Sequence, residues 1–248
     1  MLFDSIPSLP AEDPDLGSSR SCAACALARA CDVNNLDLVC QGELQRMMQA
    51  LGPYPPGTYL FREGDPFHAI TAVHSGTVKT FVVDAVGREH VLGFFQAGEV
   101  IGLSAIHAAR YPCNAMALDT VTLCSAPFPA VAALATRAGD LQVQLFRLLS
   151  HGIRKAALMA GDYRADERMA AFLLGLWQHR AATGCSTPCL DLVMSRADIA
   201  NHLRLATETV SRVIQRFQHD GLLRVNRRRV ELLDLARLKA LAGAISLT

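Results

Sequence analysis

The spacing of apolar and polar residues divides the chain into a strand-rich part and a helix-rich part. Between residues 54 and 129, short β-branched and aromatic runs alternate with glycines, which is typical of a compact all-β unit. Within it, the stretch VVDAVGREHVL predicts a hairpin with its turn at residues 85–88. Residues 43–51 carry the pattern of a short amphipathic helix that ends at Gly52-Pro53. We therefore expect a small helix followed by a β unit.

A long helix is predicted directly after the β unit. A short helix at residues 129–134 precedes it, and the long helix spans residues 141–161. Apolar or small residues recur along it at spacings of three, four and seven, and they form one seam made of Leu141, Leu145, Leu148, Gly152 and Met159. Such a seam suits pairing with a second copy of the chain, although packing on the chain's own β unit explains the same periodicity.

The remainder of the chain predicts three helices, a two-stranded wing and a short helix capped by Asp234. The three helices span residues 165–180, 196–203 and 207–220. Ser195 is placed to cap the middle helix. A capped helix, a short break, a second helix and an arginine-rich hairpin together are typical of a DNA-binding winged helix.

The third of these helices carries the side chains that could read DNA. Its polar face offers short or fork-shaped groups, and an arginine there can hold guanine O6 and N7 while a glutamate accepts from cytosine N4. Residues at the start of the preceding helix and on the wing could contact phosphates, which fixes position without specifying sequence. The predicted DNA-binding residues are Thr207, Glu208, Ser211, Arg212, Gln215, Ser195, Arg196, Arg227 and Arg228.

Charge is distributed in a way that agrees with this prediction. The whole chain of 248 residues has a net charge of +1, but residues 162–248 hold 13 basic against 9 acidic residues, whereas residues 1–161 hold 11 against 14. A positive module attached to an acidic one suits contact with phosphates. The chain shows no basic and apolar leader and no apolar run of about 18 residues, so we expect a cytoplasmic protein without a membrane partner.

Cysteines provide the candidate sensor chemistry. In the reducing cytoplasm we do not expect the eight cysteines to form structural disulfides. Cys22, Cys25 and Cys31 form a C-x2-C-x5-C array, and three thiolates so close together favour zinc, copper(I) or an iron–sulfur cluster. A fourth ligand is then needed, for which Cys113 and Cys124 are the candidates. Cys40, Cys185 and Cys189 are interpreted as ordinary thiols.

Two stretches carry a family resemblance. SRADIANHLRLATETVSRVIQRFQHDGLL resembles the winged helix-turn-helix of the FNR/CRP family of bacterial transcription regulators, and PGTYLFREGD with SGTVKTF and GFFQAGEVIG resembles its β-roll. The resemblance implies an α+β fold with an N-terminal β-roll, a jelly roll like that of cyclic-nucleotide-binding domains, then a long dimerisation helix and a C-terminal winged helix-turn-helix. The expected boundaries are 1–40 for a flexible tail with the cysteine segment, 41–136 for the β-roll sensor domain, 137–161 for the dimerisation helix and 162–248 for the winged helix-turn-helix domain.

The resemblance also implies partners and a sensor, with the oxygen-sensing FNR (fumarate and nitrate reductase regulator) branch as the nearest. A homodimer would bind double-stranded DNA at a palindromic TTGAT-like site, because Glu208, Ser211 and Arg212 match the branch's E-x-x-S-R positions, and activation would involve RNA polymerase. The array resembles the branch's N-terminal motif for a 4Fe-4S cluster. Cys124, three residues before Pro127-Phe128, matches the fourth ligand, and Cys113 is the fallback.

Other readings remain. A cyclic nucleotide is not expected, because the family's phosphate-binding Arg-Ser pair and ribose-binding glutamate are absent from the matching stretches 112–115 and 102–104. The same DNA-binding regulator could instead use zinc or a thiol–disulfide switch in place of the cluster. The third interpretation is a cysteine-based redox enzyme. Two observations argue against it: the chain has no C-x-x-C beside a βαβ pattern, and it has no dinucleotide-binding loop. We therefore expect that the protein is not an enzyme.

Overall fold

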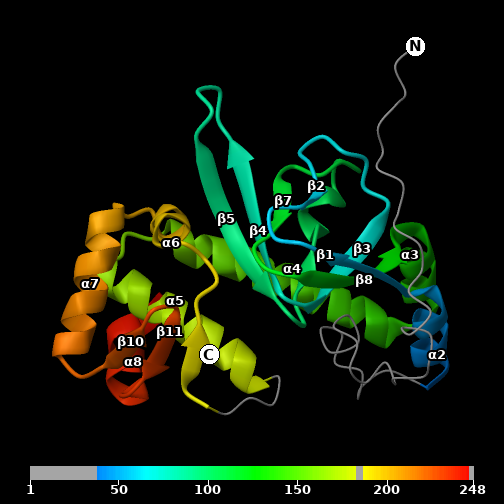
Figure 1. Ribbon diagram of the computed structural model, residues 1–248. Coiled ribbons are helices and arrows are strands. Elements are labelled where there is room, and N and C mark those ends of the chain that lie inside the picture. The colour runs from blue at the N-terminus through cyan, green and yellow to red at the C-terminus, as the bar shows by residue number, and fades with distance from the viewer. Residues whose placement is uncertain (1–37, 183–186, 246–248) are drawn as a thin grey trace.

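The computed structural model describes residues 38–182 and 187–245 (Figure 1). Its first part is a β-roll of two antiparallel four-stranded sheets, with the strand orders β1-β8-β3-β6 and β2-β7-β4-β5. Apolar side chains from both sheets meet between them, among them Val73, Val78 and Leu123. The strands are β1 (Gln49–Tyr54), β2 (Tyr59–Phe61), β3 (Ala69–Ser75), β4 (Thr77–Val83), β5 (Glu89–Gln96), β6 (Val100–Ile101), β7 (Asn114–Ala117) and β8 (Val121–Pro127).

Three helices cover the outer face of the first sheet. They are α2 (Leu38–Met47), α3 (Phe128–Arg137) and the beginning of α4 (Gly139–Ala160), and a short 3-10 turn, η4, spans Leu103–Ala105. Cys40 and Leu44 of α2 pack with Leu134 of α3 and Leu141 of α4 in one apolar cluster. The β-roll therefore has a second core, between its first sheet and these helices.

The helix predicted at residues 43–51 is only partly correct. Helix α2 begins earlier and ends at Met47, and Gln49–Tyr54 forms β1 instead. Strand β1 pairs with β8 along its length, for example Ala50 opposite Cys124. Pairing with a strand that lies far away in the sequence decided the conformation here, because local propensity is a weak preference that tertiary contacts override.

The C-terminal part is a helical unit with a small sheet. It contains α5 (Ala165–Ala182), α6 (Arg196–Leu203), α7 (Thr207–His219), α8 (Leu235–Ala242) and the 3-10 turn η5 (Gly243–Ile245). Its sheet has the order β10-β11-β9, in which β10 (Leu223–Asn226) and β11 (Arg229–Leu232) form the predicted wing. Strand β9 (Cys189–Asp191) is a third strand that the sequence did not predict. The α+β fold with a β-roll, a long helix and a winged helix-turn-helix is confirmed.

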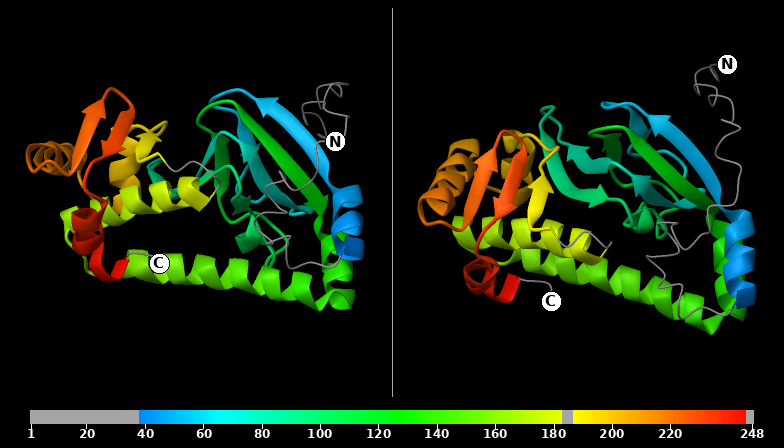
Figure 2. Two further views of the ribbon diagram at one scale, coloured as in Figure 1. Left: turned by 90° about the horizontal axis from the view of Figure 1, so that it is seen from below. Right: turned by 60° about the horizontal axis from the view of Figure 1, so that its bottom comes forward.

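The C-terminal unit packs against the β4–β5 hairpin (Figure 2). Asn201 of α6 accepts a hydrogen bond from Val91 N at 2.8 Å and donates one to Glu89 O at 2.6 Å. Lys79 of β4, whose side chain is 8% exposed, contacts Glu89 at 2.7 Å and Asp198 at 3.0 Å. These polar contacts join the first helix of the helix-turn-helix to the β-roll. Within the described ranges, no helix is both long and apolar enough to cross a bilayer.

Candidate nucleic-acid interface and sensor cysteines

The helix-turn-helix begins with a side-chain cap. Ser195 Oγ accepts a hydrogen bond from Asp198 N at 3.0 Å and donates one to Asp198 Oδ2 at 2.6 Å, which satisfies a backbone donor at the start of α6. Partial burial acts to raise the pKa of Asp198, but hydrogen bonds from Ser195 and Lys79 outweigh it and leave this pKa below its ordinary value. Asp198 is therefore a carboxylate that ties the cap to the β-roll.

Helix α7 separates a buried face from a polar one. Val210, Val213 and Phe217 are buried in the C-terminal core. Ser211 Oγ donates to Thr207 O at 3.1 Å, so this side chain lies along its own helix. The helix lies on the side of the C-terminal unit away from the β-roll (Figure 1). The predicted base-reading residues are all exposed on it: Thr207, Glu208, Ser211, Arg212 and Gln215.

The predicted phosphate contacts differ in how open they are. Arg227 and Arg228 are exposed in the turn between β10 and β11, where Arg227 has a positive φ of 55°. Arg224 is paired with Glu231 at 2.9 Å, so part of the charge of the wing is neutralised. Arg196 is half-buried, burial lowers its pKa, and its Nη1 has no hydrogen-bond partner among the described residues. The turn therefore offers its cations more freely than the start of α6.

Helix α4 presents two faces, and the predicted seam lies on the inner one. Leu141 has no exposed surface, and Leu145 and Leu148 are half-buried, because all three pack in the cluster beneath the first sheet. In the single chain Leu141 therefore offers no surface to a partner, and its role in dimerisation stays a prediction. Gly152 is exposed, and the side chain of Met159 lies outside the described residues.

The exposed apolar face of α4 is a different row that the sequence prediction missed. Val143, Phe146 and Ile153 are 46%, 60% and 71% exposed. With 3.6 residues per turn, this row lies roughly 140° around the helix from the predicted seam. The spacings of three and seven residues between these apolar positions are visible in the sequence. Ser150, however, occupies the helical position between Phe146 and Ile153 and interrupts the apolar pattern.

The structure separates the two candidates for a fourth metal ligand. Cys124 is half-buried on β8 and packs at the edge of the cluster that contains Cys40 and Leu44 of α2. Cys113 lies between the two sheets with 6% exposure, and burial, with a smaller contribution from the charge of Glu63, raises its pKa to about 11. A thiol must lose its proton to bind a metal, so the raised pKa disfavours Cys113 as a ligand.

The other predicted ligands lie outside the described residues, namely Cys22, Cys25 and Cys31. Cys185, interpreted as an ordinary thiol, lies outside them as well. Residues 38–182 and 187–245 contain no group of three His, Cys, Asp or Glu side chains that could hold a metal ion. The structure therefore does not test the N-terminal array as a metal site.

Known proteins match this chain over both of its parts. A Crp-like helix-turn-helix domain matches residues 167–241, and a cyclic nucleotide-binding domain matches residues 52–138. The transcriptional activator protein Anr of Pseudomonas aeruginosa is 40% identical over 225 residues, which cover 90% of this chain and 92% of that protein. The chain belongs to the FNR/CRP family.

Other FNR/CRP regulators extend the comparison. The fumarate and nitrate reduction regulatory protein of Salmonella typhimurium is 33% identical over 230 residues, covering 92% of each chain. The structure of FixK2 from Bradyrhizobium japonicum superposes with a TM-score of 0.68 at 24% identity and covers 79% of this chain and 97% of that one, which shows a common fold. The helix-turn-helix makes this FNR/CRP member a DNA-binding regulator, and such regulators are not enzymes.

Proposed function

We propose that the protein is an oxygen- or redox-responsive transcription activator that binds a palindromic TTGAT-like site as a homodimer while a 4Fe-4S cluster is bound. Its ligands would be Cys22, Cys25, Cys31 and Cys124. The observation that carries the proposal is the position of Cys124, a half-buried thiol on β8 beside the helix that follows the cysteine array. Its soft sulfur donor suits an iron–sulfur centre.

Only a short connection separates the array from α2. Cys31 precedes the start of α2 at Leu38 by seven residues, and an extended chain of that length spans at most about 25 Å. Helix α2 itself contacts β8 and contributes Cys40 and Leu44 to the cluster beside Cys124. A segment that begins on this helix is therefore tethered close to the proposed fourth ligand.

The same apolar cluster connects the sensor to the long helix. When bound, the 4Fe-4S cluster would supply an oxygen-sensitive cross-link between the cysteine array and β8. Cys124 packs in one cluster with Leu141, Leu145 and Leu148, and β8 continues directly through α3 into α4. Ordering of the cysteine array against this apolar cluster of side chains would therefore stabilise the first half of α4.

Pairing through α4 would form the homodimer. The exposed row of Val143, Phe146 and Ile153 is an apolar surface that a second copy would remove from water. Regulators of this family work as dimers. A dimer brings two α7 helices to two half-sites, so loss of pairing removes about half of the DNA contacts.

Base reading would fall to α7. Arg212 would hold a guanine through two hydrogen bonds, and Glu208 and Ser211 would select its neighbours. All three side chains are exposed and none is engaged in an ion pair within the described part of the chain. The relatives named transcriptional activators support RNA polymerase as a further partner.

The β-roll would act as a scaffold and not as a cyclic-nucleotide receptor. Asn114, in the stretch that matches the family's phosphate-binding position, is buried. Its side chain accepts from Glu63 N at 3.2 Å and donates to Phe81 O at 3.4 Å. These bonds commit it to the protein, and the stretch 112–115 itself contains no arginine that could hold a phosphate.

The test is a comparison of Cys124→Ser with Cys113→Ser in protein purified without oxygen. We expect wild type and Cys113→Ser to contain iron and acid-labile sulfide and to bind a TTGAT-type palindrome, with binding lost on exposure to air. Cys124→Ser should lack the cluster and bind weakly in both conditions. Zinc without sulfide in the wild type, or equal cluster content in both variants, would overturn the proposal.

A further inference from the structure

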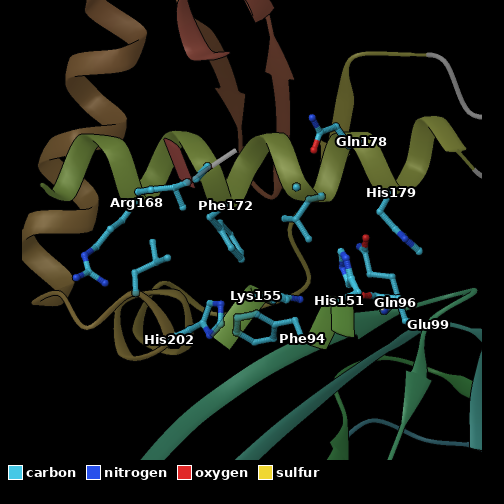
Figure 3. A pocket seen from close by; sticks show the side chains of 15 residues that line it. Phe94, Gln96, Glu99, His151, Lys155, Arg168, Phe172, Gln178, His179 and His202 are labelled. Atoms are coloured by element: carbon cyan, nitrogen blue, oxygen red, sulfur yellow. Dashed lines mark hydrogen bonds between the residues drawn. The ribbon is translucent and has the colours of Figure 1, made fainter. Parts of the chain in front are cut away.

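A cavity of about 250 Å³ lies where the β-roll, the long helix and the DNA-binding unit meet (Figure 3). Phe94 and Gln96 come from β5, His151 and Lys155 from α4, and His202 from α6, while α5 forms one wall. The volume is just below the range of about 300–1,000 Å³ that is common for small-molecule sites. A compact molecule of one or two rings would therefore fill it.

Aromatic side chains form the apolar part of this cavity. The rings of Phe94 and Phe172 stand 6.0 Å apart, and the His202 ring meets the edge of Phe94 at 5.3 Å. Figure 3 shows these three rings gathered on one side of the cavity, with Lys155 among them. Flat ligand rings are favoured by such surroundings, because aromatic pairs prefer offset or edge-to-face contacts.

The polar groups of the cavity have unmet hydrogen-bonding capacity. His202 is 8% exposed, and its Nδ1 has no hydrogen-bond partner among the described residues; the same holds for Oε1 of Gln96. Burial, followed by the positive charge of Lys155, lowers the pKa of His202 to about 4, so its ring is neutral near pH 7. A neutral ring that is hydrogen-bonded to the Val91 carbonyl through its other nitrogen leaves Nδ1 as an acceptor.

Lys155 supplies a cation to the same space. It forms no ion pair with any described carboxylate; its ammonium lies 5.8 Å from the centre of the Phe95 ring. Arg168, the other permanent cation here, already donates to Tyr163 O and Gly161 O. Glu99 accepts a hydrogen bond from Gln96 N. The group that is still open to a ligand anion is therefore Lys155.

We propose that this cavity binds a small aromatic carboxylate that also carries an N–H or O–H donor. Its ring would lie against Phe94 and Phe172, its carboxylate would meet Lys155, and its donor would satisfy His202 or Gln96. Such a ligand touches β5, α4 and α6 together, so its binding stabilises this placement of the DNA-binding unit. Lys155 lies roughly 120–160° around α4 from Val143 and Ile153, so pairing through that row does not require this side chain.

Calorimetric titration of the full chain tests this proposal, with indole-3-acetate as the anionic probe and indole-3-acetamide as its neutral counterpart. Gly175→Leu should fill the cavity, because Gly175 lines it and a Cβ there meets no atom within 4 Å. Leucine also favours the helix over glycine, so this variant should fold. Ala182→Leu, on the same helix but outside the cavity, is the matched control.

We expect saturable binding of indole-3-acetate to the wild type and to Ala182→Leu, and none to Gly175→Leu. Lys155→Gln should weaken binding of the acid about tenfold, as expected for a lost charge-assisted hydrogen bond, and leave the amide unchanged. Failure of the wild type to bind the acid would overturn the proposal, as would equal affinity for acid and amide or binding that survives Gly175→Leu. Each of these results is independent of cluster content and of DNA binding.

Discussion

Replacing Ile153 tests which face of α4 joins two copies of the chain. In the single chain this side chain is 71% exposed, so its removal should not affect the fold of the monomer. In a dimer paired through Val143, Phe146 and Ile153, the same side chain would be buried in both subunits. Ile153→Ala should therefore weaken dimerisation specifically.

The expected magnitude follows from the exposed fraction. Full burial of an isoleucine side chain is worth about 1.5–3 kcal/mol. With 71% of it exposed in the monomer, each subunit contributes about 1–2 kcal/mol, and the dimer therefore loses about 2–4 kcal/mol. The dissociation constant should rise about 30- to 900-fold.

Sedimentation equilibrium on anaerobically prepared protein measures this change. Gly152→Leu is the matched control, because Gly152 neighbours Ile153 but lies on the seam that the sequence predicted, and a Cβ there meets no atom within 4 Å. We expect Gly152→Leu to dimerise like the wild type. Weaker dimerisation of Gly152→Leu with an unchanged Ile153→Ala would refute the reasoning and place the interface on the other row.

Three further predictions concern stability and DNA reading. The pKa of His202 is about 4 in the folded chain and about 6.5 in the unfolded chain. Between these two pH values the unfolded state therefore binds more protons than the folded state. The free energy of unfolding should be highest above about pH 6.5, and about 3 kcal/mol of it should be lost as the pH falls to about 4. Urea unfolding of His202→Gln should lack this component, and an identical pH profile would contradict the assignment. Gly76→Ala should cost about 2–4 kcal/mol in thermal unfolding, because Gly76 has φ +84° and a Cβ there overlaps a backbone carbonyl, whereas Gly87→Ala, at φ +81° in open space, should cost about 1–2 kcal/mol. In gel-shift titrations Arg212→Ala should lose roughly 1–3 kcal/mol at one base pair, whereas Arg228→Ala should weaken all sequences alike and reduce the salt dependence; uniform loss with Arg212→Ala would exclude base reading.

Local sequence determined the helix-turn-helix nearly to the residue. Helix α6 starts after Ser195 and α7 starts at Thr207, as predicted, because capping groups and a 3.6-residue apolar period act within one or two turns. The β4–β5 hairpin was also predicted from the local sequence, and Asp84 and Gly87 belong to its turn in the structure. The resemblance to the FNR/CRP family came from the helix-turn-helix and from three stretches of the β-roll.

Tertiary contacts decided what the local pattern left ambiguous. The sequence shows apolar positions on more than one face of α4. Only the packing beneath the first sheet shows that Leu141 is buried within its own chain while Ile153 is exposed. The family resemblance favoured Cys124 over Cys113 as the fourth ligand, and the structure adds the surroundings of each, with Cys113 between the sheets and Cys124 beside α2. Periodicity identifies that a face is apolar but not what covers it, because the covering residues come from distant parts of the chain. The sequence by itself predicted most of the elements and the polar face of α7, whereas the structure determined which surfaces remain exposed for a partner or a ligand.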